Sequence, residues 1–569
     1  MTDFEIQQFT FSGEDLKAWQ ALDGRHRNWP VVYTLDGAGK VYVGESLNAA
    51  GRFKQHLDTT KKALRHARVV LDPTFNKSVC LDLESHLIRW FHGDEKYQVL
   101  NRNDGITNAD YYLRSTYRPT FEAIFDELRE LGAFSRSIKE IENTDLFKLS
   151  PFKALTPDQA IAVEDILSGL FDDLEHDRSS RIVIQGDPGT GKTVVGIYLM
   201  KLLSDIKNAD LSEPVDSDSL LSEFFVEGYP QLLRDFRVGL VVPQQSLRGS
   251  IRKVFKKTPG LGPDMVITAF EAGKADDMFD LLIVDEAHRL NQRASLGSGP
   301  QNADFRVVNE KLFGHDDPEL TQLDWINKIS RHQIYLIDAA QTVRPADLPR
   351  AALDALVSTA HTAKRHYRLT SQMRVQAGSD YVGYVRGVLD GSVTKRQTFE
   401  GYDLRFFDSL QAMRTAIIEQ DASHGLARLL AGYAWPWASK KDPQAFDIVV
   451  DGVELWWNKT QVDWVNTTTS LDEVGSIHTI QGYDLNIAGV IIGGDLRFDP
   501  ASERLVFDKA SYFDAKGKQN NVKRGITYSD EELLQFVKNI YAVLLTRGIL
   551  GTYVYVHDTT LREYLRRFF

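Results

Sequence analysis

The residues best suited to chemistry lie in the segment 181–200, RIVIQGDPGTGKTVVGIYLM. It contains the pattern Gly-x-x-x-x-Gly-Lys-Thr between an apolar run, typical of a strand, and a run typical of a helix. The glycines are Gly186, Gly189 and Gly191. They allow backbone N–H groups to approach phosphate oxygens, and the start of the helix adds a favourable dipole. We expect Lys192 to reach the β and γ phosphates of ATP and Thr193 to bind Mg²⁺.

An acidic pair further along the chain completes this chemistry. Asp285 and Glu286 close the apolar run of the segment DLLIVDEAHRL, which is typical of a buried strand. We expect Asp285 to order Mg²⁺ and Glu286 to activate the water that attacks the γ phosphate. The loop and the acids together predict a site for ATP hydrolysis. The letters Asp-Glu-Ala-His also suggest a superfamily 2 helicase, but the chain lacks the repeated-arginine final motif of that family.

Further short motifs lie in a definite order around these two. FKALTPDQA contains Gln159, IYLIDAAQTVRP contains Gln341, LTSQMRV contains Arg374, and YAVLLTRG contains Arg547 after Thr546. The segment IHTIQGYDL contains His478, Thr479, Gln481 and Gly482. In this order, over nearly the whole stretch from 152 to 556, the motifs resemble those of superfamily 1 helicases. The Gln-x-Arg of the fourth motif is similar to that of the group that includes the motor part of Schlafen-like proteins.

This resemblance implies a role for each residue. Gln159 would read the adenine, and Gln341 would sense the γ phosphate. Arg374 and Arg547 would reach across a cleft between two RecA-like domains and stabilise the charge that builds on the γ phosphate. The fifth motif would add Gln481 and Gly482 to the nucleotide-binding residues. Hydrolysis would then be coupled to opening and closing of the cleft, which is how such a motor walks along nucleic acid.

The first hundred residues contain a second constellation. Two runs typical of strands, WPVVYTL and KVYVGE, are separated by the turn DGAG. They contain Val31-Val32-Tyr33 and Tyr42-Val43-Gly44, and the residues that follow are Arg52, His56, Glu84 and Asn101. In this order the set resembles the GIY-YIG nuclease family. The first motif departs from the family because valines replace its glycine and isoleucine, whereas its tyrosine is retained.

The nuclease resemblance implies hydrolysis of a phosphodiester, which requires a water nucleophile and relief of charge on the phosphate. Glu84 would hold a single Mg²⁺ or Mn²⁺, and Tyr42 or Tyr33 would orient or deprotonate the water. Arg52 would bind the phosphate. His56 lies one helical turn after Arg52 and would assist proton transfer or phosphate binding.

The elements that must position these residues indicate an α/β protein. The chain of 569 residues is too long for one hydrophobic core. Strand-like apolar runs alternate with helical patterns after residue 151, which predicts parallel sheets. We therefore expect four parts: a small α/β nuclease domain over 1–115, a helical linker over 116–150, and two RecA-like domains over 151–345 and 346–569.

Charge and composition limit the kinds of partner and site that we expect. A net charge of −12 argues against a globally basic nucleic-acid binder, so contact with nucleic acid must be local. The segment 247–257, LRGSIRKVFKK, is the basic stretch we expect to touch a single-strand backbone. The one cysteine, Cys80, excludes an internal disulfide and a cysteine-based zinc site. No apolar run approaches a membrane span and the N-terminus does not resemble a secretory signal, so we expect a cytoplasmic protein.

The resulting hypothesis is an ATP-dependent translocase or helicase joined to a metal-dependent endonuclease. DNA is the favoured substrate, in bacterial antiphage defence or in repair. Two alternatives stay open. One is an RNA-directed nuclease-ATPase, because neither motif set distinguishes a 2′-hydroxyl. The other is an ATPase switch that nucleic acid triggers. Its first domain would bind without cutting, and ATP would control assembly with a protein partner or into an oligomer.

Overall fold

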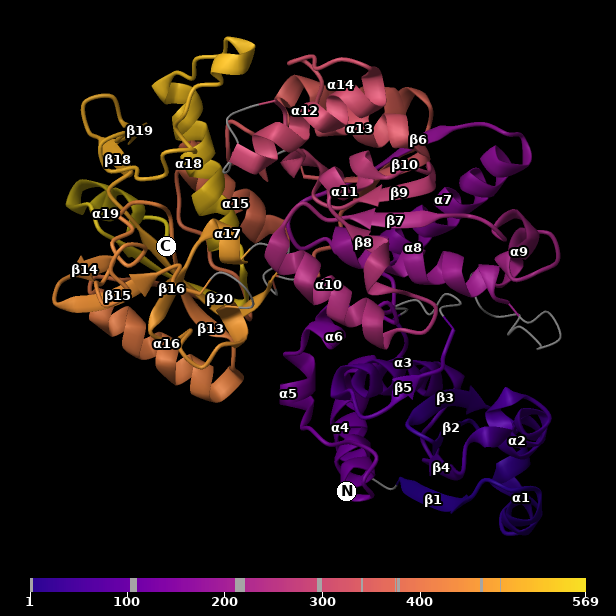
Figure 1. The fold of residues 1–569 in the computed structure, drawn as a ribbon. Helices are drawn as coiled ribbons and strands as arrows, with labels where there is room; N and C mark the ends of the chain where they lie inside the picture. The colour runs from indigo at the N-terminus through magenta and orange to yellow at the C-terminus, as the bar shows by residue number, and fades with distance from the viewer. Residues whose placement is uncertain are drawn as a thin grey trace. The chain divides into compact units, whose positions relative to one another are not determined.

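The computed structural model describes residues 4–102, 110–209, 221–293, 299–338, 341–373, 375, 379–460, 464–480 and 483–569. The chain divides into two compact units (Figure 1). The first comprises Met1–Phe171, Ile197–Asp235 and Ile251–Pro263. The second comprises Asp172–Gly196, Phe236–Ser250 and Asp264–Phe569. Three helices are divided between the units: α7 (Pro157–Glu175), α8 (Lys192–Lys207) and α10 (Gln245–Lys257).

The described residues of the first unit contain a five-stranded sheet in the order β1-β4-β2-β3-β5. Its strands are β1 (Glu5–Thr10), β2 (Val31–Gly37), β3 (Lys40–Ser46), β4 (His66–Leu71) and β5 (Gln98–Val99). The first four are antiparallel to their neighbours, and β5 runs parallel to β3. The turn between β2 and β3 consists of Ala38 and Gly39, whose φ angles of 50° and 74° are those of a two-residue hairpin turn. The expected pair of strands and the turn between them are therefore present.

Strand alternation assigns each face of this sheet to different helices. The side chains of Val32 and Val43 pack with α3 (Lys77–Asp94), whereas Tyr33 and Leu35 on the opposite face pack with α2 (Ala49–Leu57). Beyond α2 and α3, the unit contains α1 (Gly13–Gln20), α4 (Arg114–Glu130), α5 (Ile138–Glu142), α6 (Asp145–Lys148) and α9 (Tyr229–Leu232). The segment 116–150 contains most of α4 together with α5 and α6, and α4 shares the core of α3.

Within its described residues, the second unit contains two large sheets. The first has six parallel strands in the order β11-β6-β10-β9-β7-β8. These are β6 (Ser180–Gly186), β7 (Val238–Val241), β8 (Val266–Ile267), β9 (Phe279–Val284), β10 (Ser330–Ile337) and β11 (His366–Leu369). Its helices are α11 (Ala269–Lys274), α12 (Gly299–Phe313), α13 (Gln322–Ile329) and α14 (Arg350–Thr362). The central strands β9 and β10 each end in an apolar run that is fully buried, Leu281–Val284 and Ile334–Ile337.

The second sheet of this unit follows the order β12-β20-β17-β13-β16-β15-β14 and is parallel except for the pair β14 and β15. Its strands are β12 (Asp403–Phe407), β13 (Ala427–Ala431), β14 (Ile448–Val450), β15 (Val453–Trp457), β16 (Glu473–Gly475), β17 (Leu485–Ile492) and β20 (Gly548–Val556). The antiparallel hairpin β18 (Leu496–Asp499) and β19 (Arg504–Phe507) accompanies it. The helices are α15 (Ser379–Asp390), α16 (Leu410–His424), α17 (Ile477–Ile480), α18 (Asp530–Leu545) and α19 (Thr559–Leu565).

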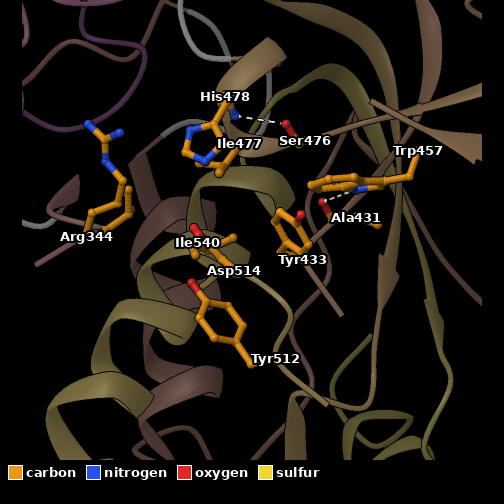
Figure 2. A pocket seen from close by; sticks show the side chains of 11 residues that line it. Arg344, Ala431, Tyr433, Trp457, Ser476, Ile477, His478, Tyr512, Asp514 and Ile540 are labelled. Carbon is orange, nitrogen blue, oxygen red and sulfur yellow. Dashed lines mark hydrogen bonds between the residues drawn. The ribbon is translucent and has the colours of Figure 1, made fainter. Parts of the chain in front are cut away.

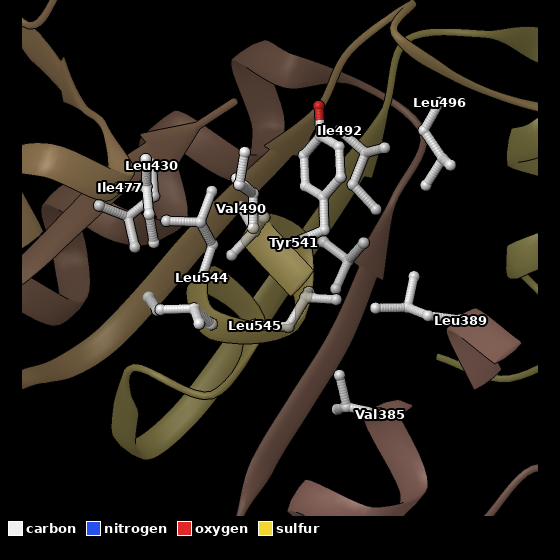
Figure 3. Packing of buried hydrophobic residues seen from close by; sticks show 14 of the residues in the cluster. Val385, Leu389, Leu430, Ile477, Val490, Ile492, Leu496, Tyr541, Leu544 and Leu545 are labelled. Carbon is white, nitrogen blue, oxygen red and sulfur yellow. The ribbon is translucent and has the colours of Figure 1, made fainter. Parts of the chain in front are cut away.

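Helices α15 and α18 pack into the core of this second sheet (Figure 3). Val490 and Ile492 of β17 pack with Leu544 and Leu545 of α18, and Val385 of α15 belongs to the same buried cluster. The two largely parallel sheets confirm the expected α/β class. The expected boundary at 345/346 precedes β11, which belongs to the first of the two sheets because it pairs with β6. Among the described helices, none is long and apolar enough to cross a bilayer.

Candidate functional site

The Gly-x-x-x-x-Gly-Lys-Thr segment forms a loop between the end of β6 and the start of α8. Gly189 and Gly191 have φ angles of 87° and 79°, which residues with a Cβ atom rarely adopt. A Cβ atom at Gly186 would lie 2.3 Å from Thr190 Oγ1, so this glycine allows the loop to fold tightly over the end of the strand. The glycines of the motif are therefore needed for the backbone path of the loop.

Lys192 and Thr193 occupy the first turn of α8. Lys192 Nζ donates to the carbonyl oxygens of Gly186 and Asp187, at 2.7 and 3.0 Å, and so lies within the curve of the loop. The Thr193 hydroxyl donates to both carboxylate oxygens of Asp285, at 3.1 and 3.0 Å. The loop and the acid that follows β9 are thus in direct contact.

The donor set around Thr193 fits Mg²⁺. Asp285 is buried, and burial together with the charge of Glu286 raises the pKa of Asp285 above its ordinary value. A divalent cation would offset this concentration of negative charge, and hard oxygen donors are the ligands that Mg²⁺ prefers. Thr193 and Asp285 are the residues that would hold it.

A buried histidine, His288, lies beside Glu286. His288 Nε2 lies 3.0 Å from Glu286 Oε2, and the backbone N–H of Asp338 donates to His288 Nδ1 at 3.3 Å. Because Nδ1 accepts, the proton of a neutral His288 resides on Nε2, which faces the glutamate. Burial favours the neutral acid, but His288 and the positive charges of Lys192 and Arg547 outweigh it and keep the pKa of Glu286 below its ordinary value.

Two further motif residues lie around this acid. Arg547 is buried between the end of α18 and the start of β20, and its Nη1 donates to the carbonyl of Tyr483 at 3.4 Å. Its charge acts on Glu286 from the second large sheet. Gln341 is also buried and donates through Nε2 to Asp338 Oδ2 at 2.6 Å. Arg547 therefore acts on Glu286 through its charge, whereas Gln341 contacts Asp338, whose N–H donates to His288.

Of the remaining residues in the helicase-like motifs, the structure describes some and not others. Arg374, Gln481 and Gly482 lie outside the described residues. Gln159 belongs to the first compact unit, where its side-chain oxygen accepts a hydrogen bond from the Thr156 N–H at 3.1 Å at the start of α7. Its role in adenine recognition stays a prediction.

A small pocket lies beside the fifth motif (Figure 2). His478 and Ser476 at the start of α17 and Arg344, which follows β10, contribute to its wall. Trp457 and Tyr433 also line it, and their ring centroids are 4.4 Å apart.

In the basic stretch 247–257, Arg248 donates to the carbonyls of Val242 and Pro243, at 2.9 and 3.4 Å, and so anchors the first turn of α10.

In the first unit, the β2–β3 hairpin places the two tyrosines of the second constellation on one face. Tyr33 pairs with Gly44, and a Cβ atom at Gly44 would lie only 2.4 Å from Tyr33 Oη. The glycine of the second motif therefore makes room for the Tyr33 ring to lie across its neighbouring strand. The centroid of Tyr42 is 6.3 Å from that of Tyr33.

His56 forms a hydrogen bond with Tyr33. Tyr33 Oη and His56 Nε2 share a buried hydrogen bond of 2.8 Å, and the Tyr42 ring lies edge-on to His56 with centroids 5.1 Å apart. Burial, with the charges of Lys61 and Arg52, lowers the pKa of His56 to about 3. His56 is therefore neutral at neutral pH, and this contact suits positioning of Tyr33.

Arg52 and Glu84 act on the same hydroxyl. Burial raises the pKa of Tyr33 well above its ordinary value, Tyr42 and Glu84 raise it further, and Arg52 opposes them. The five side chains expected to do the nuclease chemistry thus come from β2, β3, α2 and α3 to one place. Among the described residues, no group of three or more His, Cys, Asp or Glu side chains could hold a metal ion. A single carboxylate such as Glu84 fits Mg²⁺, which keeps most of its water ligands.

Asn101 extends the edge of the sheet. Its Nδ2 donates to the Val43 carbonyl at 2.8 Å, and its Oδ1 accepts from the Val43 N–H at 3.1 Å. Strand β5 pairs only with Lys40 and Val41, so the Asn101 amide continues the ladder beyond the end of β5. These two hydrogen bonds fix the backbone of β3 at Val43, the residue that follows Tyr42. The motif order predicts Asn101 as a member of the set, but spacing along the chain does not indicate its contacts.

One family model and one related protein match large parts of the chain. The family model for the Schlafen group 3 DNA/RNA helicase domain matches residues 179–558. An uncharacterized protein of Saccharomyces cerevisiae is 25% identical over 475 residues, which cover 79% of this chain and 98% of that protein.

Two solved structures are also similar. The Pif1 helicase from Candida albicans is 13% identical with a TM-score of 0.21, and the match covers 47% of this chain and 55% of that one. The match therefore spans about half the length of that structure. Bacteroides Pif1 bound to single-stranded DNA is 9% identical with a TM-score of 0.25, over 69% of this chain and 92% of that one.

Proposed function

The chain belongs to the Schlafen group 3 DNA/RNA helicase domain family, and from this membership we propose that it is an ATP-driven translocase of nucleic acid. The observation that carries the proposal is the contact of Thr193 with Asp285, beside Lys192 and the Glu286–His288 pair. This is the arrangement that hydrolysis of a nucleoside triphosphate requires.

Each residue has a part in that reaction. Lys192 and the loop N–H groups bind the phosphates, and Mg²⁺ held by Thr193 and Asp285 supplies charge neutralisation. Glu286 accepts the proton of the attacking water, and its carboxylate lies 3.0 Å from His288 Nε2. Arg547 stabilises the charge that develops on the γ phosphate. Arg374 and Gln341 remain in the roles the family resemblance implies.

Directed movement on a strand tests the motor proposal. Streptavidin bound to one end of a biotinylated oligonucleotide should be displaced faster with ATP than without it. Lys192→Ala should abolish the ATP-dependent part, because the β and γ phosphates lose their cation, whereas Lys207→Ala at the exposed end of the same helix should not. We expect activity on DNA, and parallel RNA oligonucleotides test the RNA alternative. Equal displacement with and without ATP on every strand would contradict movement.

We propose metal-dependent phosphodiester cleavage as a second activity, supported by the group of Tyr33, Tyr42, Arg52 and Glu84. Glu84 would hold Mg²⁺ or Mn²⁺, which supplies Lewis acidity for the leaving oxygen. Arg52 would bind the phosphate, and a tyrosine hydroxyl would orient the water. His56 positions Tyr33 through their hydrogen bond. A motor paired with such a nuclease suits antiphage defence or repair within the cytoplasm, alone or with a protein partner.

Cleavage of labelled single- and double-stranded DNA and RNA, with Mg²⁺ or Mn²⁺, tests the nuclease proposal. Glu84→Gln should abolish cutting and leave ATP hydrolysis intact. Glu122→Gln is the matched control, because Glu122 is a surface carboxylate of α4 that pairs with Arg118. If no substrate is cut with either metal, the first domain is a binding module and the alternative of an ATP-controlled switch gains support.

A further inference from the structure

An arginine outside the motifs contacts the phosphate loop. Arg386 Nη1 donates to Asp187 Oδ1 at 2.7 Å, and Arg386 Nη2 lies 3.7 Å from Asp338 Oδ1. Asp187 is the loop residue directly after Gly186, and Asp338 directly follows β10. The guanidinium therefore lies between the loop that binds phosphates and the acid that holds Gln341.

The helix that carries Arg386 is anchored to the other sheet. Tyr381, Val385 and Leu389 of α15 are buried in the core of the seven-stranded sheet, and the Tyr381 hydroxyl donates to the Leu545 carbonyl at 2.9 Å. Arg386 follows Val385 directly, and its side chain is partly exposed. A shift of its guanidinium would therefore be felt by the second sheet through α15.

Asp187 makes this arginine necessary. It places a half-exposed carboxylate in a loop whose ligand is an anion, and a carboxylate repels phosphate oxygens unless a cation neutralises it. Neighbouring contacts join the same loop to the segment before α15. Gln372 Nε2 donates to the Pro188 carbonyl, and the Met373 N–H donates to the Gly189 carbonyl, both at 2.8 Å. The loop and the start of the second sheet's helices therefore meet at several points.

We propose that Arg386 is a third γ-phosphate-binding arginine, which exchanges its bond to Asp187 for one to the γ phosphate of ATP. The inference rests on the proposed ATP hydrolysis and adds a specific sensor to it. Two carboxylates hold the guanidinium ready, and its planar fork suits a phosphate as well as a carboxylate. Because ADP has no γ phosphate, Arg386 distinguishes ATP from ADP, and the guanidinium leaves Asp187 only with ATP.

Equilibrium binding of ADP and of a non-hydrolysable ATP analogue to the full chain tests this. Arg386→Ala should weaken the analogue about tenfold and leave ADP within about twofold, since only the γ-phosphate contact is lost. Arg386→Lys should be intermediate, because a lysine keeps the charge without the fork. Arg405→Ala is the matched control, since Arg405 is a half-exposed arginine of β12 paired with Asp403.

Asp187→Asn provides an independent measurement. Removal of the competing carboxylate should tighten the analogue about threefold while ADP changes less, because Arg386 no longer has to leave a charged partner. The proposal is overturned if Arg386→Ala weakens both nucleotides equally, or if it leaves the analogue unchanged. A wild-type chain that binds neither nucleotide would instead contradict the ATPase proposal itself, so the two failures are distinguishable.

Discussion

At the scale of single residues, both candidate sites are organised by histidines that the motifs did not identify as positioning groups. His288 lies 3.0 Å from the Glu286 carboxylate, and His56 holds Tyr33 through a hydrogen bond. In each case the sequence supplied the residue, but its neighbours along the chain do not say which ring nitrogen faces which group. That depends on the Asp338 N–H for His288 and on the packing of α2 against β2 for His56.

Burial of neutral His56 makes the chain sensitive to acid. The folded-state pKa of about 3 lies below the ordinary value of 6.5, so the unfolded chain binds the proton more readily between these values. The stability that neutral His56 contributes is therefore fully present above pH 6.5, and it decreases as the pH falls toward 3. At pH 5 the loss relative to pH 7 is about 2 kcal/mol from this group.

Urea denaturation of wild type and His56→Gln at pH 7, 6 and 5 measures this effect. Glutamine keeps a hydrogen-bonding group near Tyr33 but does not titrate, so the variant should lose less stability on acidification than wild type. The difference between the two proteins isolates His56 from the other histidines. Parallel losses in both proteins would show that His56 is not buried in the neutral form.

At the scale of elements, β3 depends on one side chain for the order of its outer edge. The Asn101 amide bonds both backbone groups of Val43 where β5 no longer pairs with β3. Asn101→Leu would leave a buried N–H and C=O without partners, at a cost of about 1–3 kcal/mol each. We expect a lower unfolding midpoint, faster amide exchange at Val43 and weaker nuclease activity. Unchanged exchange at Val43 would contradict this role.

Local elements were predictable, because their signals lie in short stretches of sequence. The strand, loop and helix around Lys192 and the hairpin that carries Tyr33 and Tyr42 have the expected form. The packing of α4 was also encoded, since its buried residues recur at helical spacing: Phe121, Ile124, Phe125 and Leu128. The charged residues of the same segment do not indicate which core this helix joins.

Contacts between distant segments were not predictable in the same way. The first large sheet extends to β11 because that strand pairs with β6, and no local pattern indicates which sheet a short strand joins. Arg386 meets Asp187 across almost two hundred residues of chain, within a helix whose pattern indicates only a buried apolar face. Such pairs depend on how whole sheets pack.

At the scale of the whole molecule, the two candidate sites lie in different compact units. The nuclease group belongs to the first unit, and Lys192, Asp285 and Glu286 belong to the second. Variants of one site should therefore leave the other folded, which makes the two activities separable by experiment. The net charge of −12 implies that binding of nucleic acid depends on local contacts and weakens with salt.

Steady-state ATP hydrolysis, with and without single-stranded DNA or RNA, tests the central claim most directly. We predict hydrolysis that a single strand stimulates, and a decrease in kcat of at least about a hundredfold in Glu286→Gln, because the attacking water loses its base. Binding of ATP by that variant should persist. Absence of hydrolysis by the wild-type chain on every strand, or wild-type rates in Glu286→Gln, would contradict the account.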